Sequence, residues 1–101
     1  MKMIYVTCNV SVREPLINLL EEHEISDYQV IEQVPAKNVK GDPRLNTAVW
    51  PSHNSSIFMQ FSDDEMAREI MKIIRDFNRE AYNDNELVTA CMWTLDDYFY
   101  E

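Results

Sequence analysis

Glycine, proline and cysteine are scarce in this 101-residue sequence, which contains one glycine, four prolines and two cysteines. A single glycine excludes collagen-like and glycine-rich sequences. Two cysteines are too few for the disulfide framework of a small secreted domain, and Cys8 and Cys91 lack the spacing of a zinc or redox motif. We therefore expect both to be free thiols.

Long apolar runs and basic side chains are also scarce. No apolar run approaches the roughly 18 residues of a membrane-spanning helix, so membrane insertion is not expected. Nine basic against eighteen acidic residues give a formal charge of −9, which repels phosphate backbones and anionic lipid surfaces. Nucleic acid is therefore not an expected partner. The N-terminal segment lacks the small-residue cleavage site of a signal peptide, so we expect a cytoplasmic location.

The sequence does have the composition of one globular domain. Hydrophobic residues make up 46% and charged residues 27%, and both are ordinary values for a globular chain. A chain of this length forms one hydrophobic core rather than two. We therefore expect a single domain over residues 1–101.

Hydrophobic periodicity predicts six secondary-structure elements. Apolar residues at helical intervals predict helices over residues 11–24 and 62–81. Ser11 and Ser62 each stand three residues before a glutamate, which is the spacing of a capping box. Alternating or continuous apolar segments predict strands at residues 3–10, 27–34, 55–61 and 86–95.

This order of elements is typical of the α+β ferredoxin-like fold, βαββαβ. Right-handed crossovers place both helices on one face of a four-stranded antiparallel sheet. The last strand is apolar on both faces, however. Because the helices cover only one face, we expect another copy of the chain to cover the other. The residues on its two faces are Val88, Ala90 and Met92 on one, and Leu87, Cys91, Trp93 and Leu95 on the other.

A connection over about residues 36–54 separates the second and third predicted strands. Connections of this length in a small domain are usually functional or disordered. It carries Lys37, Lys40 and Arg44, which make it the one basic segment of an acidic chain, and Gly41 adds backbone freedom. The segment is either a switch that binds an acidic partner surface or a solvated connection that its charges keep soluble.

Few other residues indicate a chemical site. His53 ends the long connection and is either a metal ligand or a surface histidine that closes a turn. Trp50 either stacks on a ligand or anchors the connection. Cys8 and Cys91 lie on strands that the topology pairs, so they could approach each other or a metal, or act as small hydrophobic side chains. No catalytic motif is present, so an enzyme is not expected.

The order of elements and the long connection resemble the PII-like superfamily, which includes the nitrogen regulatory protein PII and the CutA divalent-ion tolerance proteins. The most specific resemblance is the run Gly-Asp-Pro-Arg-Leu over residues 41–45 and the run Val-Trp-Pro-Ser-His-Asn-Ser over residues 49–55. The resemblance implies a homotrimer with inward-facing sheets, ligands in the clefts between subunits, and a loop that engages partner proteins.

Two functions follow from the resemblance. The first is a cytoplasmic signal-transduction protein that binds a small ligand or ion at the trimer clefts and engages a protein partner, such as a membrane transporter, through the 36–54 loop. Lys37, Lys40, Gly41, Arg44 and Trp50 would then be the ligand and partner residues. The second is a CutA-like trimer that binds a divalent metal, with His53 as a ligand, and has no protein target.

The ligand itself is left open. PII proteins hold ATP or ADP phosphates partly with glycine-rich, basic segments. The corresponding segment here, residues 78–86, has no glycine and three acidic residues. We therefore do not expect ATP or ADP as ligands, and a divalent metal is an alternative.

Overall fold

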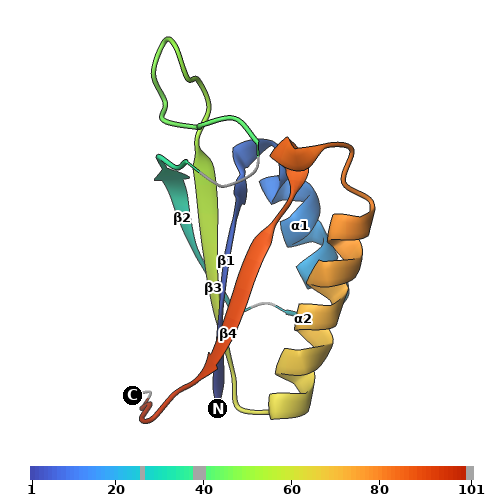
Figure 1. The fold of residues 1–101 in the computed structure, drawn as a ribbon. Coiled ribbons are helices and arrows are strands. Elements are labelled where there is room, and N and C mark those ends of the chain that lie inside the picture. Colours follow the sequence, from blue (N-terminus) through green and yellow to red (C-terminus); the bar gives the residue numbers. More distant parts are fainter. Residues whose placement is uncertain (26, 38–40, 100–101) are drawn as a thin grey trace.

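The computed structural model describes residues 1–25, 27–37 and 41–99. It contains four strands, two α-helices and one turn of 3-10 helix, all drawn in Figure 1. No helix within the described residues is long and apolar enough to cross a membrane. The elements are β1 (Lys2–Asn9), α1 (Val10–Glu22), β2 (Gln29–Val34), β3 (Asn54–Phe61), α2 (Asp64–Arg79), η1 (Asp84–Glu86) and β4 (Thr89–Thr94).

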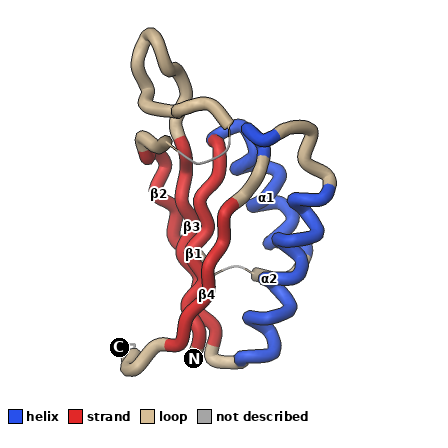
Figure 2. Tube along the Cα trace, in the orientation of Figure 1, coloured by secondary structure: helices blue, strands red, loops and turns tan. Residues whose placement is uncertain are grey.

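The strands form one antiparallel sheet in the order β2-β3-β1-β4. Both helices lie on the same face of this sheet, and the opposite face has no covering element among the described residues (Figures 1 and 2). The predicted ferredoxin-like βαββαβ fold is therefore confirmed. The core lies between the helices and the sheet, and its fully buried large side chains are Ile4, Val6, Leu16, Leu20, Ile57, Met59, Ile70 and Ile74.

The uncovered face of the sheet carries a band of partly apolar side chains. Tyr5 and Phe58 are directly opposite each other on β1 and β3, with ring centroids 4.8 Å apart. Ile31 is 48% exposed on β2 and Trp93 is 43% exposed on β4. Successive strand residues point to opposite faces, so the expected two-sided apolar character of the last strand is present.

Both predicted capping boxes are wrong. The side chain of Asn9 accepts a hydrogen bond from the backbone N–H of Ser11 at 3.1 Å, so Asn9 caps α1. The side chain of Asp63 likewise accepts from Glu65 N–H at 2.9 Å and caps α2. Asparagine and aspartate cap at least as well as serine. Asn9 is also the last paired residue of β1, so the chain turns into the helix directly from the strand.

The structure also corrects the start of the last strand and distinguishes between the alternatives for the cysteines, which are both free thiols as expected. The predicted strand at 86–95 begins only at Thr89, because the side-chain amide of Asn78 holds both the N–H and the C=O of Val88 at 2.7 Å. Cys8 is buried against the helices, whereas Cys91 is exposed and lies opposite Tyr5. The two thiols are on opposite faces of the sheet and do not approach each other.

Candidate functional site

Arg44 anchors the long loop to the body of the protein. Its backbone forms two hydrogen bonds of 2.7 Å with Ala36, one in each direction, which close the first half of the loop. The residue is 4% exposed. The guanidinium donates from Nε to Asn54 Oδ1 at 2.7 Å and from Nη1 to Asn85 Oδ1 at 3.3 Å. Arg44 is therefore an internal residue and not one of the exposed charges of a basic loop.

Gly41 is held in a tight contact beside this arginine. Its φ is +82°, and a Cβ at this position would lie 2.7 Å from Asn85 Oδ1. The next backbone N–H, that of Asp42, donates to the same Oδ1 at 2.8 Å. Glycine is required here both by the left-handed backbone and by the close approach. This contact joins the loop to the η1 segment.

Arg44 lines a pocket of about 330 Å³ at the base of the loop. Its described contacts use Nε and Nη1, and Nη2 has no partner among the described residues. No carboxylate of the described part of the chain lies within ion-pair distance of it. A positive charge that is nearly buried without a carboxylate favours an anion beside it. The pocket is lined by Asn9, Asp42, Pro43, Arg44, Val49, Trp50, Pro51, Ser52 and Asn85.

The pKa of the buried Cys8 thiol reflects the positive charges near this pocket. Burial raises the pKa of Cys8 from 9.0 to about 11, and the positive charges of Arg13 and Arg44 partly offset that rise. Arg13 reaches the same region from α1, with its Nη1 3.4 Å from Ser55 Oγ. Two guanidinium groups thus create a positive potential at this end of the sheet, in a protein whose net charge is −9.

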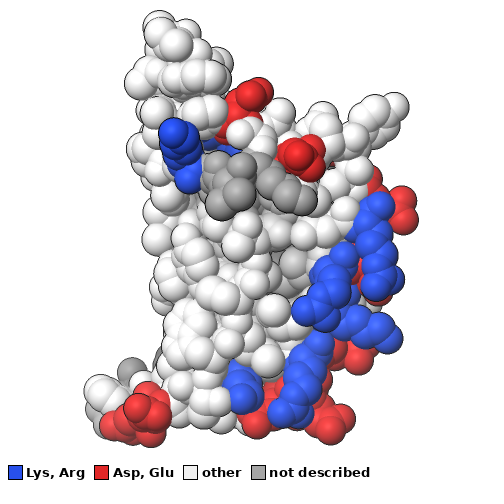
Figure 3. All heavy atoms as spheres, viewed as in Figure 1, with Lys and Arg blue, Asp and Glu red and all other residues white. Residues whose placement is uncertain are grey.

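The outer part of the loop is hydrogen-bonded within itself and carries no charged side chain. Asn46 N–H donates to Ser52 O at 2.8 Å, and Thr47 and Trp50 exchange backbone and hydroxyl hydrogen bonds of 3.0 Å. Val49 is 77% exposed and Trp50 is 42% exposed, and Trp50 also lines the pocket. Figure 3 shows the projecting part of the loop without charged side chains and the charges gathered at its base.

The other predicted site residues have separate environments. Lys37 is exposed at the base of the loop, and Lys40 lies outside the described residues. His53 is half-buried, and its backbone oxygen accepts a hydrogen bond from Val10 N–H at 3.0 Å. Among residues 1–25, 27–37 and 41–99, no group of three or more histidine, cysteine, aspartate or glutamate side chains could hold a metal ion. His53 as a metal ligand stays a prediction.

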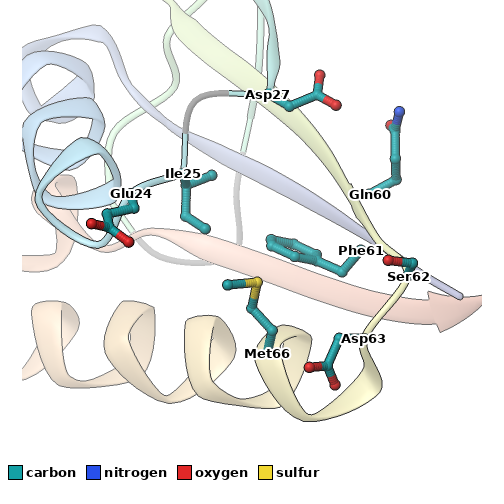
Figure 4. Close-up of a pocket in the computed structure, with 8 residues that line it drawn as sticks. All are labelled: Glu24, Ile25, Asp27, Gln60, Phe61, Ser62, Asp63 and Met66. Atoms are coloured by element: carbon teal, nitrogen blue, oxygen red, sulfur yellow. The ribbon is translucent and has the colours of Figure 1, made fainter.

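A second hollow lies at the opposite end of the sheet, where β3 leads into α2 (Figure 4). Its volume is about 220 Å³. The side chains of Ile25, Phe61 and Met66 form its apolar part, and Glu24, Asp27 and Asp63 add three carboxylates and no base. The negative charge makes this hollow unsuitable for an anion. The pocket beside Arg44 has one carboxylate, that of Asp42, together with an arginine, so it is the better candidate for a small anionic ligand.

Comparison with known proteins supports the fold. No family model and no curated protein matches the sequence. Among solved structures, a putative PII-like signalling protein from Thermus thermophilus is 17% identical with a TM-score of 0.60, over 91% of this chain and 83% of that chain. CPII from Thiomonas intermedia, bound to ADP and bicarbonate, is 11% identical with a TM-score of 0.65, over 95% of this chain and 88% of that chain.

These likenesses show that the chain has the fold of PII-like signalling proteins, as the order of its elements predicted. A further structure of CPII, with the same TM-score of 0.65, is bound to ADP, AMP and bicarbonate. The expectation that ATP and ADP are not ligands therefore finds no support among the structural neighbours. Sequence reasoning also missed Asn54 and Asn85, whose contacts with Arg44 span 10 and 41 residues of chain.

Proposed function

We propose that this protein is a PII-like regulatory protein that binds a small anion at Arg44 and engages a protein partner through the 36–54 loop. The observation that carries the proposal is the nearly buried guanidinium at the pocket wall, held by two amide oxygens and by no carboxylate of the described chain. The structural neighbours with ADP, AMP and bicarbonate support the same ligand class. The role is binding rather than catalysis.

The chemistry of the pocket suits an anion with two oxygens in one plane. A guanidinium presents its N–H groups as a planar fork, which matches carboxylate, bicarbonate and phosphate groups. The indole of Trp50 adds a flat apolar surface to the same pocket, and an aromatic surface of this kind can stack on a nucleobase. Bicarbonate would contact only the guanidinium of Arg44, whereas a nucleotide would contact both this guanidinium and the indole of Trp50.

The uncovered sheet face supports a homotrimer with the sheets packed inward. Tyr5, Phe58 and Trp93 leave a partly apolar band on this face, and their burial between copies would remove it from water. The loop projects from one end of the sheet and stays free of such a packing (Figure 1). Its exposed, uncharged turn would then contact the partner protein. An example of such a partner is a membrane transporter, which the protein would reach from the cytoplasm.

Isothermal titration of the full chain with ADP, AMP and bicarbonate tests the anion site. We expect at least one probe to bind with a dissociation constant below about 1 mM. Arg44→Gln should weaken that binding at least tenfold, because a hydrogen bond to a charged group contributes about 1.5–3 kcal/mol. Arg44→Lys keeps the positive charge but loses the planar fork of N–H donors, so its affinity should fall between those of wild type and Arg44→Gln.

Arg68→Gln is the matched control, since Arg68 is exposed on α2 and is absent from the pocket lining. It makes the same change in charge and should leave binding unchanged. Circular dichroism establishes that each variant is folded. If no probe binds the wild type, or if a folded Arg44→Gln or Arg44→Lys variant binds as tightly as the wild type, the proposed site is wrong.

A further inference from the structure

One side-chain oxygen connects the loop to the candidate pocket. Asn85 Oδ1 accepts from the backbone N–H of Asp42 at 2.8 Å and from Arg44 Nη1 at 3.3 Å. Gly41 makes room for this oxygen, since a side chain there would meet it at 2.7 Å. Asn85 is itself positioned in η1, where its backbone N–H donates to Asn83 Oδ1 at 2.9 Å.

The two contacts of the guanidinium differ in strength. The Nε contact to Asn54 is 2.7 Å, a normal length for a hydrogen bond from a charged donor, whereas the Nη1 contact to Asn85 is 3.3 Å. The weaker contact is also on the nitrogen that a forked anion would use. Nη1 carries two N–H groups, so an anion held by Nη1 and Nη2 lies beside Asn85 Oδ1 and leaves the contact with Asn54 in place.

An asparagine amide has an acceptor at one end and a donor at the other. An anion at Arg44 would lie close to Asn85 Oδ1, and two groups that only accept hydrogen bonds repel each other. A half-turn of the amide removes the repulsion, because Nδ2 then donates to the anion. The same half-turn places Nδ2 opposite Asp42 N–H, and two donors cannot bond.

We propose that Asn85 is a latch that releases the Gly41–Asp42 segment of the loop when an anion occupies the pocket. The inference rests on the proposed anion site and gives its regulation. In the empty pocket, the amide oxygen holds Asp42 N–H and the guanidinium together. In the occupied pocket, the amide turns toward the ligand, and the loop loses its bond to η1. Anion binding thereby changes the hydrogen bonding at the base of the partner-binding loop.

Amide hydrogen exchange of Asp42, measured by NMR on the full chain, tests the latch. The probe is ADP or bicarbonate, whichever gives the larger heat of binding. At saturation with this probe, the Asp42 amide of the wild type should exchange about five- to tenfold faster than without it, because the loss of one ordinary hydrogen bond has an effect of this size. Asn85→Ala should show the same acceleration without a probe, and the probe should add nothing. Asn83→Asp keeps a good cap for η1 and should behave as wild type.

A second comparison uses affinity. Asn85→Asp keeps the acceptor but offers no donor to the anion, so it should weaken probe binding at least tenfold relative to Asn83→Asp, which has the same charge two residues away. Probe binding to the wild type without faster exchange at Asp42 would overturn the latch and leave the proposed function intact. Unchanged exchange in unliganded Asn85→Ala would also overturn the latch. Absence of probe binding to the wild type would overturn both proposals.

Discussion

Three polar residues that are distant in sequence, Arg44, Asn54 and Asn85, form one cluster at the base of the long loop. From composition, Arg44 was indistinguishable from Lys37 and Lys40, because all three are cations in one segment. The structure separates Arg44 from Lys37 by burial, since Arg44 is inside and Lys37 is exposed. Burial of a charged loop residue depends on partners that only the fold brings together, so no local pattern could have predicted it.

Gly41 provides a test of this cluster by stability. Gly41→Ala should lower the free energy of unfolding by about 1–3 kcal/mol, because alanine is strained at φ +82° and its Cβ would meet Asn85 Oδ1 at 2.7 Å. Urea denaturation measures the change. Asn46→Gly, at φ 57° in the same loop, is the control and should stay within about 0.5 kcal/mol. Equal stability of Gly41→Ala and wild type would contradict the close contact.

Cys8 leads to a prediction about pH. Its pKa is raised from 9.0 to about 11 in the folded protein, so between these values the folded state holds a proton that the unfolded state has released. Stability from this group is complete below pH 9 and falls as the pH rises toward 11, by about 2–3 kcal/mol. Urea denaturation between pH 8 and pH 11 should show a smaller decrease for Cys8→Ala than for wild type. An identical decrease in wild type and Cys8→Ala would refute the assignment.

At the scale of the element, periodicity predicted all four strands and both α-helices, while several ends were wrong. Ile70 and Ile74 belong to one apolar face of α2. This face made the helix predictable, because a helix with such a face must bury it. The ends depend on single hydrogen bonds, and serine, asparagine and aspartate compete for the same capping position. The start of β4 depends on Asn78, which lies on another element and leaves no trace in the local sequence.

The cap of α2 can be assigned by mutation. Asp63→Ala should reduce stability by about 1 kcal/mol, because it removes the acceptor for Glu65 N–H and a negative charge at the helix N-terminus. Ser62→Ala should change it by less than about 0.5 kcal/mol. Thermal unfolding followed by circular dichroism compares the two variants. A larger loss for Ser62→Ala would restore the capping box at Ser62.

At the scale of the whole molecule, the sequence supplied the fold and the uncovered sheet face. It supplied neither the pairing of Tyr5 with Phe58, which needs the strand register, nor the pocket, which needs the loop to fold back onto η1. Long-range contacts of this kind link positions whose side chains look ordinary in sequence. The fold was therefore predictable from the sequence, whereas the site was predictable only as the 36–54 segment and not as its individual contacts.

Assembly is the prediction at this scale. Size-exclusion chromatography with light scattering should give three times the 12.0 kDa mass of one chain. Trp93→Glu places a charge on the uncovered face, where Trp93 is 43% exposed, and should dissociate the trimer. Tyr82→Glu changes a side chain that is 91% exposed in the connection before β4 and should leave it intact. A wild-type mass of one chain at micromolar concentration would contradict the inward packing of the sheets.

Anion binding at Arg44 is tested by the NMR signal of the Arg44 side-chain Nε–H group. This N–H is held by Asn54 Oδ1 at 2.7 Å, so its signal should be resolved from those of the exposed arginines. During titration with ADP or bicarbonate, we expect a saturable shift of the Arg44 signal and no shift of the Arg68 signal. A probe that binds the protein but leaves the Arg44 signal unchanged, or moves both signals alike, would contradict the claim.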